Sequence, residues 1–361
     1  MELPEGSPVR LTRRTLGRTD VAVTCLGLGG GALGGLYEPV TETAACSAVE
    51  HAYKMGIRYF DTAPLYGHGR SEERLGRVLE GYDRASFVLS TKVGIMIEPL
   101  EAKDRTIEER YADPFLIDGR YDFSYDACLR SLEASMRRLR TDRIDVVYIH
   151  DPDEGNSLLP PPSRQPVDHF KEVLEGAYKA LHELRAQGVI GAIGVGLNGT
   201  GLLAELARAG DFNCFLLAGR YTLLEQGGLD DLFPVCRERG VSIVVGGVFN
   251  SGILALGSSD SKSTYNYDVA DPEMLARVRE LEAVCSRHGV TLPAAALQFP
   301  LAQDVVAAVI PGARSLQEVD ANLSHIAQEI PPPFWKELTD ENLIDFRAPV
   351  PGSPPVVLNN R

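Results

Sequence analysis

Four polar side chains end or follow three consecutive candidate strands, and together they suit proton transfer. Asp61 ends the second strand of the chain, and Tyr66 lies in the loop after it. Lys92 ends the third strand and His150 ends the fourth. A free tyrosine has a pKa of about 10, which a neighbouring cation such as Lys92 lowers. With Asp61 keeping that lysine protonated and His150 bonding a substrate oxygen, the set predicts general acid–base catalysis at a carbonyl or carbinol carbon.

Each of these residues also has a purely structural interpretation. An aspartate–lysine pair can be a simple ion pair, a tyrosine after a strand can be a rim residue, and a histidine there can bond to backbone. Their placement at three neighbouring strand ends favours the functional interpretation. A metal centre is less favoured: His150, Asp151 and Asp61 could bind one ion, but Lys92 opposes a cation. Neither H-x-H nor H-E-x-x-H occurs, so no metal is expected.

Short apolar runs alternate with amphipathic segments along nearly the whole chain. Eight of these runs are continuously apolar, as in parallel strands that are buried on both faces. The runs are 23–28, 57–61, 86–92, 144–150, 190–195, 213–217, 241–246 and 305–310. Helical patterns lie at 42–55, 71–80, 125–140, 168–187, 200–209, 228–239, 272–288 and 315–327.

Eight strand–helix units in series predict a closed (β/α)8 TIM barrel, with residues 1–361 as one domain. A doubly wound sheet is the alternative, but it would use fewer strands or show a break before a second domain. Residues 9–22 predict a hairpin that turns at Gly17 and closes the barrel bottom, and the proline-rich tail 347–361 is expected to be irregular. Three long segments after strands are expected to cover the C-terminal mouth, the first of them carrying an aromatic group. They are 93–124 (with Tyr111, Phe115, Tyr121 and Phe123), 151–167 and 247–271.

Two glycine-rich stretches, 29–34 and 194–199, match the G-x-G-x-x-G pattern after a strand. A dinucleotide fingerprint also needs an acidic residue about 20 positions later, at the end of the next strand. Neither stretch has one. We therefore interpret both as close approaches of backbone or ligand at strand ends, and not as Rossmann motifs.

Composition excludes several classes of protein. The chain has 361 residues, of which 44% are hydrophobic and 24% charged, and its formal net charge is −14. A field of that sign disfavours nucleic acid and anionic membrane surfaces as partners. No run is long enough to span a membrane and no signal peptide is recognisable. The six cysteines form no C-x-x-C pair, which predicts reduced core residues and a cytoplasmic protein.

The sequence resembles the aldo-keto reductase family. The resemblance covers most of the chain in order, through the stretches 56–76, 90–94, 138–153, 188–198 and 309–322. It implies a (β/α)8 barrel that binds NAD(P)H without a Rossmann fold. It also implies a catalytic set of Asp61, Tyr66, Lys92 and His150, with Tyr66 as general acid–base.

The same resemblance implies where the cofactor binds. Asn198 matches the asparagine that holds the nicotinamide carboxamide, and the turn at Gly312 matches a phosphate-binding turn. A strand end leading into a helix N-terminus suits phosphate. Arg314 is placed to contact a phosphate and Asn322 to face adenine.

Three departures from the family pattern bear on the cofactor. Many NADP-preferring members carry a lysine near Gly312 and an arginine near Glu318. A glycine and a carboxylate stand here, which favours NAD over NADP, although Arg314 leaves NADP possible. The glutamine of strand six is replaced within 218–221, and Gly246 stands where many members stack an aromatic ring. The residues expected to compensate are among Arg220, Tyr221 and Phe249.

Shorter stretches are most similar to a bacterial group of aldose and pyridoxal dehydrogenases within the family: 120–126, 219–226 and 246–254. This similarity implies oxidation of a sugar or similar cyclic hemiacetal to a lactone, with hydride transfer to NAD+. The alternatives are an NADPH-dependent aldehyde or ketone reductase, a non-catalytic nicotinamide-binding sensor, and a metal-dependent barrel hydrolase. The expected partner is a small carbonyl or sugar substrate, and the sequence does not predict the oligomeric state.

Overall fold

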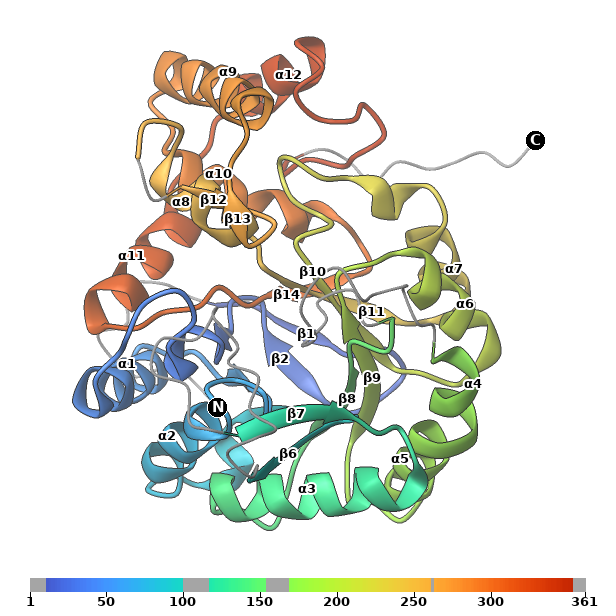
Figure 1. Ribbon diagram of the computed structural model, residues 1–361. Helices are drawn as coiled ribbons and strands as arrows, with labels where there is room; N and C mark the ends of the chain where they lie inside the picture. Colours follow the sequence, from blue (N-terminus) through green and yellow to red (C-terminus); the bar gives the residue numbers. More distant parts are fainter. Residues whose placement is uncertain (1–10, 100–116, 154–168, 261–262, 353–361) are drawn as a thin grey trace.

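The computed structural model describes residues 11–99, 117–153, 169–260 and 263–352. Its centre is a sheet of eight parallel strands, hydrogen-bonded in the order β14-β11-β10-β9-β8-β5-β4-β3 (Figure 1). In chain order these strands are β3 (Leu28–Gly29), β4 (Tyr59–Asp61), β5 (Val88–Val93), β8 (Val146–His150), β9 (Ala192–Leu197), β10 (Cys214–Ala218), β11 (Ser242–Gly246) and β14 (Val306–Val309).

Two parallel bridges join the ends of this sheet. Leu26 pairs with Val309 and Gly29 pairs with Gly312, and the Gly27 N–H donates to the Val309 carbonyl at 2.9 Å. The first strand region therefore meets the last, and the sheet closes on itself. The prediction of a (β/α)8 barrel is confirmed, and the eight predicted runs each contain or overlap one of its strands.

Helices alternate with the strands and cover the outside of the barrel (Figure 1). Those that follow successive strands are α1 (Glu42–Lys54), α2 (Arg70–Leu79), α3 (Tyr125–Leu139), α5 (Tyr178–Ala186), α6 (Gly201–Ala209), α7 (Leu232–Arg239), α10 (Leu292–Gln298) and α11 (Leu316–Ala327). A short helix α4 (Phe170–Glu172) and a π-helical turn, Val173–Ala177, precede α5.

The prediction for the seventh unit was wrong in one respect. The predicted helix 272–288 exists as α9 (Pro272–His288), but α10 follows it, and α10 packs against α11 whereas α9 packs against α12 (Pro332–Asp340). Both α10 and α12 lay outside the predicted pattern. Three prolines at 331–333 made a helix at α12 look unfavourable from the sequence, although proline suits the first turn of a helix. Phe334, Trp335 and Leu338 bury its apolar face.

The predicted N-terminal hairpin is present and ends later than expected. It pairs β1 (Arg13–Thr15) with β2 (Ala22–Thr24), so part of the run predicted as the first barrel strand belongs to the hairpin. Arg14 donates to the carbonyls of Val306 and Leu301, near the start of β14. The hairpin therefore covers the N-terminal end of the barrel, opposite the expected active face.

The long segments at the other end contain regular structure. Within 93–124, β6 (Ile95–Pro99) pairs with β7 (Ile117–Tyr121). Within 247–271 lie a 3-10 turn (Asn250–Gly252), α8 (Ile253–Leu256) and a hairpin of β12 (Thr264–Tyr265) and β13 (Asp268–Val269). Tyr111, Phe115 and most of 151–167 lie outside the described residues. Of the predicted tail, 347–352 is described and contains no helix or strand.

Candidate active site

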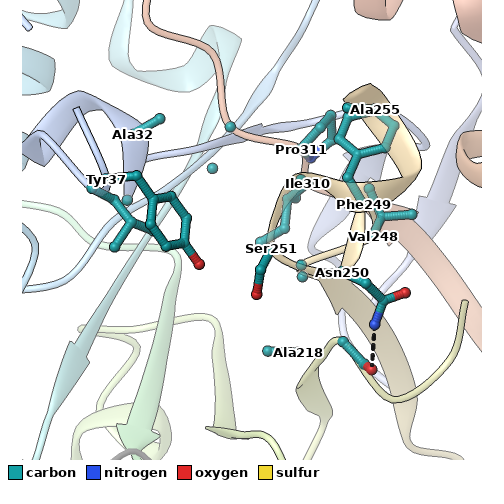
Figure 2. A pocket seen from close by; sticks show the side chains of 18 of the residues that line it. Ala32, Tyr37, Ala218, Val248, Phe249, Asn250, Ser251, Ala255, Ile310 and Pro311 are labelled. Carbon is teal, nitrogen blue, oxygen red and sulfur yellow. Dashed lines mark hydrogen bonds between the residues drawn. The ribbon is translucent and has the colours of Figure 1, made fainter. Parts of the chain in front are cut away.

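A cavity of about 1300 Å3 opens at the C-terminal end of the barrel strands. Its lining includes all nine residues predicted for catalysis and cofactor binding: Asp61, Tyr66, Lys92, His150, Asn198, Gly312, Arg314, Glu318 and Asn322. Tyr37 stands on one side of the cavity and Ser251 and Asn250 on the other (Figure 2). The structure thus brings together residues that span more than 260 positions of the sequence.

Asp61 and Lys92 form a buried ion pair at the floor of this cavity. Each is 1% exposed, and the Lys92 Nζ lies 2.7 Å from Asp61 Oδ2. Lys92 also donates to the Thr62 carbonyl at 2.8 Å. Asp61 ends β4 and Lys92 is the last residue but one of the neighbouring β5, so regular strands and not a loop hold both residues in place. Burial raises the pKa of Asp61 above its ordinary value, and the charge of Lys92 opposes that rise.

Tyr66 lies above the lysine and beside the histidine. The Lys92 Nζ is 4.7 Å from the centroid of the Tyr66 ring, and the Tyr66 and His150 rings meet edge to face with centroids 5.8 Å apart. A tight glycine contact sets the loop after Tyr66: a Cβ on Gly34 would stand 2.5 Å from the Tyr66 carbonyl carbon. Phenol, ammonium and imidazole are therefore close enough for one another's charge to affect their proton affinity.

Asp151, the residue after His150, is a further part of the site. Its side chain is buried and lines the cavity, and its Oδ2 lies 3.8 Å from His150 Nε2. Its φ of +45° is unusual for a residue other than glycine. Its N–H donates to the Gly196 carbonyl at 2.8 Å, which holds this conformation. Sequence reasoning considered Asp151 only as a metal ligand.

Asn198 follows β9 and lines the same cavity. Its Nδ2 donates to the Ala218 carbonyl at 3.1 Å and lies 3.4 Å from the Tyr267 hydroxyl. Tyr267 comes from the β12–β13 hairpin and stacks on Tyr37, with ring centroids 6.3 Å apart. The segment 247–271 therefore reaches the cavity, as predicted for a loop over the barrel mouth.

Backbone approaches the cavity closely at the turn after β14. A Cβ on Gly312 would lie 2.9 Å from the Cβ of Ala32, so only glycine leaves this gap open. Ser315 caps the N-terminus of α11 by accepting from the Glu318 N–H at 3.2 Å. Asn322, one turn further along α11, donates to the Gly312 carbonyl at 3.4 Å. Such a turn offers room and N–H dipoles to an anionic group.

Arg314, in the same turn, is paired with two carboxylates. Its guanidinium donates to Glu318 Oε1 at 2.9 Å and to Glu38 Oε2 at 2.6 Å. Its N–H donates to Glu318 Oε2 at 2.8 Å. Arg314, Glu38 and Glu318 together carry one net negative charge. Sequence reasoning missed Glu38, which lies 276 positions away in the loop before α1.

Of the three residues suggested to compensate for the missing glutamine and aromatic ring, Phe249 and Arg220 line the cavity, as does Gly246. Tyr221 does not, and that suggestion was wrong. Its side chain is fully buried, with ring centroids 4.6 Å from Phe233 and 5.3 Å from Phe299. Tyr221 therefore belongs to the apolar core outside the barrel.

The residues that the structure describes lack two other kinds of feature. They contain no group of three or more His, Cys, Asp or Glu side chains arranged to hold a metal ion. They also contain no helix that is both long and apolar enough to cross a membrane.

Comparison with known proteins gives consistent matches. Residues 25–342 match the model of the Aldo/keto reductase family. The chain is 37% identical to a pyridoxal 4-dehydrogenase of Microbacterium luteolum, over 92% of this chain and 98% of that protein. It is 36% identical to a D-threo-aldose 1-dehydrogenase of a Pseudomonas species, over 90% and 95%. A solved aldo-keto reductase from Bacillus halodurans, in its holo form, superposes with a TM-score of 0.70 at 25% identity, over 94% and 98%.

Proposed function

The chain belongs to the aldo/keto reductase family, and from that membership we propose that it oxidises the cyclic hemiacetal of a sugar, or of a similar compound, to a lactone. It is an oxidoreductase that uses a nicotinamide cofactor, like the family as a whole. The substrate class follows the two relatives described above, which are named for pyridoxal and for an aldose. Both names describe oxidation, which favours NAD+ as hydride acceptor in this chain.

The cavity fits a nicotinamide dinucleotide. Its volume of about 1300 Å3 exceeds that of ordinary small-ligand pockets, and glycines at 29–31, 246–247 and 312 leave much of its wall without side chains. We assign a phosphate of the dinucleotide to the Gly312 turn, the adenine to Asn322 and the carboxamide to Asn198. When bound, the nicotinamide ring supplies the hydride acceptor.

The four side chains at the cavity floor then carry out the proton transfer. Oxidation of the hemiacetal carbon removes a hydride from carbon and a proton from the anomeric hydroxyl. The Tyr66 oxygen takes that proton, because the Lys92 ammonium stabilises the phenolate that receives it. His150 bonds the same substrate oxygen and orients it. Asp61 keeps Lys92 charged and in place.

The observation that carries this proposal is the Lys92 ammonium 4.7 Å from the centroid of the Tyr66 ring, with Asp61 bonded behind it. Tyr66→Phe removes the proton acceptor while leaving the ring. We expect the rate of sugar or pyridoxal oxidation to fall at least about 100-fold. The Kd for NAD+, measured by calorimetry, should stay at the wild-type value. Near-normal turnover in this variant would refute the assignment of these residues.

Direction and substrate need a separate assay. A panel of aldoses and pyridoxal with NAD+ is compared with a panel of aldehydes and ketones with NADPH, by absorbance of the reduced nicotinamide. The proposal requires the first panel to give the higher kcat/KM. A higher kcat/KM in the NADPH panel would show that the enzyme is a reductase and not a dehydrogenase. Cofactor binding without turnover in either panel would indicate a sensor.

A further inference from the structure

A row of hydrogen-bonded hydroxyl and thiol groups runs through the barrel interior behind Asp61. We call this row, formed by Ser90, Tyr59, Tyr148 and Cys214, the hydroxyl file. The Ser90 hydroxyl lies 2.7 Å from Asp61 Oδ1 and 3.3 Å from the Tyr59 hydroxyl. The Tyr59 and Tyr148 hydroxyls are 3.0 Å apart, and the Cys214 Sγ lies 3.6 Å from that of Tyr148. Four barrel strands, β4, β5, β8 and β10, supply the members.

The chemistry of the carboxylate fixes the direction of these bonds. An ionised aspartate can only accept, so the single Ser90 proton points to Asp61. Ser90 then accepts from Tyr59, Tyr59 accepts from Tyr148, and Tyr148 accepts from the Cys214 thiol. Every proton in the file points toward the same negative charge. Bonds aligned in this way polarise and strengthen one another in a medium of low dielectric constant.

The file is separate from the cavity. Ser90, Tyr59, Tyr148 and Cys214 are each 0% exposed, and none of them lines the cavity, which Asp61 and Lys92 do. Burial raises the pKa of both tyrosines well above the ordinary value and that of Cys214 to about 12. All three groups therefore stay protonated across the range of an enzyme assay. Their protons reach the chemistry through Asp61, and the Tyr148 ring also faces Lys92, with its centroid 5.8 Å from Nζ. Tyr148→Phe keeps that ring.

The other charged or titratable groups around Asp61 are on the cavity side. Lys92 bonds its second oxygen at 2.7 Å. Tyr66 and His150 stand beyond that lysine. A single cation therefore faces the carboxylate from above, and the hydroxyl file faces it from below.

We propose that Ser90, Tyr59 and Tyr148 are positioning residues whose aligned hydroxyl protons hold the Asp61 carboxylate ionised. An ionised Asp61 keeps Lys92 charged and fixed beneath Tyr66. This inference deepens the proposed function and rests on it, because it assigns the tuning of the same proton-transfer group to side chains that never touch substrate or cofactor.

The test is the pH dependence of kcat in Ser90→Ala, Tyr59→Phe and Tyr148→Phe. Losing donors to a charged group raises the pKa of Asp61, so activity is lost at a higher pH on the acid side. We expect that limb to move up by about one pH unit in Ser90→Ala and by progressively less in Tyr59→Phe and Tyr148→Phe. KM and the Kd for NAD+ should stay within about twofold of wild type.

The matched control is Tyr53→Phe. Tyr53 also bonds a serine hydroxyl, that of Ser86 at 2.7 Å, but on the outer surface of the barrel. Its pH profile should superpose on that of wild type. A Tyr59→Phe enzyme that folds and binds NAD+ normally, yet shows an unmoved acid limb or a uniform loss of rate at every pH, would overturn the proposal.

A second measurement needs no turnover. Infrared difference titration follows the protonated carboxyl band of Asp61, which Asp61→Asn identifies by removing it. The midpoint should rise in Tyr59→Phe relative to wild type and stay fixed in Tyr53→Phe. If Tyr66→Phe retains activity while this midpoint shifts, the proposed function fails and the hydroxyl file stands. If Tyr66→Phe is inactive and the midpoint does not move, the proposed function stands and the role of the hydroxyl file is refuted.

Discussion

Arg314 already has two carboxylate partners, and this bears on which dinucleotide the enzyme uses. Glu38 and Glu318 bond the guanidinium that would otherwise attract a 2′-phosphate. An added phosphate would have to displace or face these carboxylates. A ribose hydroxyl could instead donate to them. The pairing supports our proposal of NAD rather than NADP.

Removing these charges should shift the preference. In the double variant Glu38→Gln and Glu318→Gln, we expect the ratio of kcat/KM for NADP+ to that for NAD+ to rise about tenfold. Two half-exposed charges near a phosphate contribute on the order of 1.4 kcal/mol, which is a factor of ten. Steady-state kinetics with each cofactor at fixed substrate measures the ratio.

The control for that experiment is Glu50→Gln. Glu50 pairs with Lys54 on the exposed face of α1 at 2.5 Å, so its loss alters the net charge of the molecule and leaves the cavity intact. Its cofactor ratio should match that of wild type. An unchanged ratio in the double variant would show that Arg314 and its partners do not select the cofactor.

At single positions, the sequence was most informative for side chains at a strand end or in the turn that follows it, and least informative for side chains in the longer loops. Asp61, Lys92 and His150 were found because parallel strands must deliver their last residues to one mouth. Glu38 and Tyr267 were missed, and Asp151 was considered only as a metal ligand, because loop conformation decides where these side chains point. Asp151 and Tyr267 both have a positive φ. Residues other than glycine normally avoid that conformation, so the sequence gives no sign of it at these two positions.

Among the elements, the N-terminal hairpin depends on one glycine. Gly17 has a φ of +55°, and a Cβ there would stand 2.4 Å from the Asn213 carbonyl oxygen. The turn is therefore both left-handed and pressed against the strand end that it covers. Because the hairpin lies at the end of the barrel opposite the cavity, it bears on stability and not on chemistry.

Gly17→Ala should lower the free energy of unfolding by about 3 kcal/mol, from backbone strain plus a backbone clash. Gly188→Ala is the matched comparison, since Gly188 has a φ of +73° with nothing within 4 Å of its Cβ position. It should cost about 1 kcal/mol. Denaturant unfolding measures both, and kcat per folded molecule should stay at the wild-type value. Equal losses would mean that the contact with Asn213 contributes nothing.

Most elements that complete a strand–helix repeat were predictable, whereas α10, which completes the seventh repeat, and the short hairpin β12–β13 were not. Continuous apolar runs and 3.6-residue patterns identified the barrel strands and most covering helices. The hairpin β12–β13 has two-residue strands, too short for any periodicity, and it depends on its contacts at the cavity. Helix α10 is a seven-residue segment close behind α9, and its pattern merges with that of its neighbour.

For the molecule as a whole, the closed barrel was predictable because closure follows from counting eight units with no break. The number of units does not predict the path of the segments over the barrel mouth. Their residues bury little apolar surface, and tertiary contacts set their conformation. The hydroxyl file shows the same limit inside the core. Tyr59, Ser90 and Tyr148 look like ordinary strand residues until the barrel brings their strands together.

The six cysteines provide a test of the packing throughout the molecule. All six are unpaired, and the prediction that all are core residues was wrong for Cys46, which is partly exposed. Burial raises the pKa of Cys128, Cys214, Cys236 and Cys285 to about 12. It also raises the pKa of Cys46, and the Glu42 carboxylate acts in the same direction.

A thiol reacts through its thiolate, so raised pKa values and burial both slow modification at pH 8. We therefore expect native protein to react slowly with no more than one equivalent of a disulfide reagent such as Ellman's, and unfolded protein to react rapidly with six. Cys46→Ser should abolish the native reaction, whereas Cys25→Ser, at a buried position, should leave it unchanged. Because Cys46 lies on α1, away from the cavity, modification should not alter kcat. Rapid titration of several thiols in the native state would contradict the packing described for the barrel and its helices.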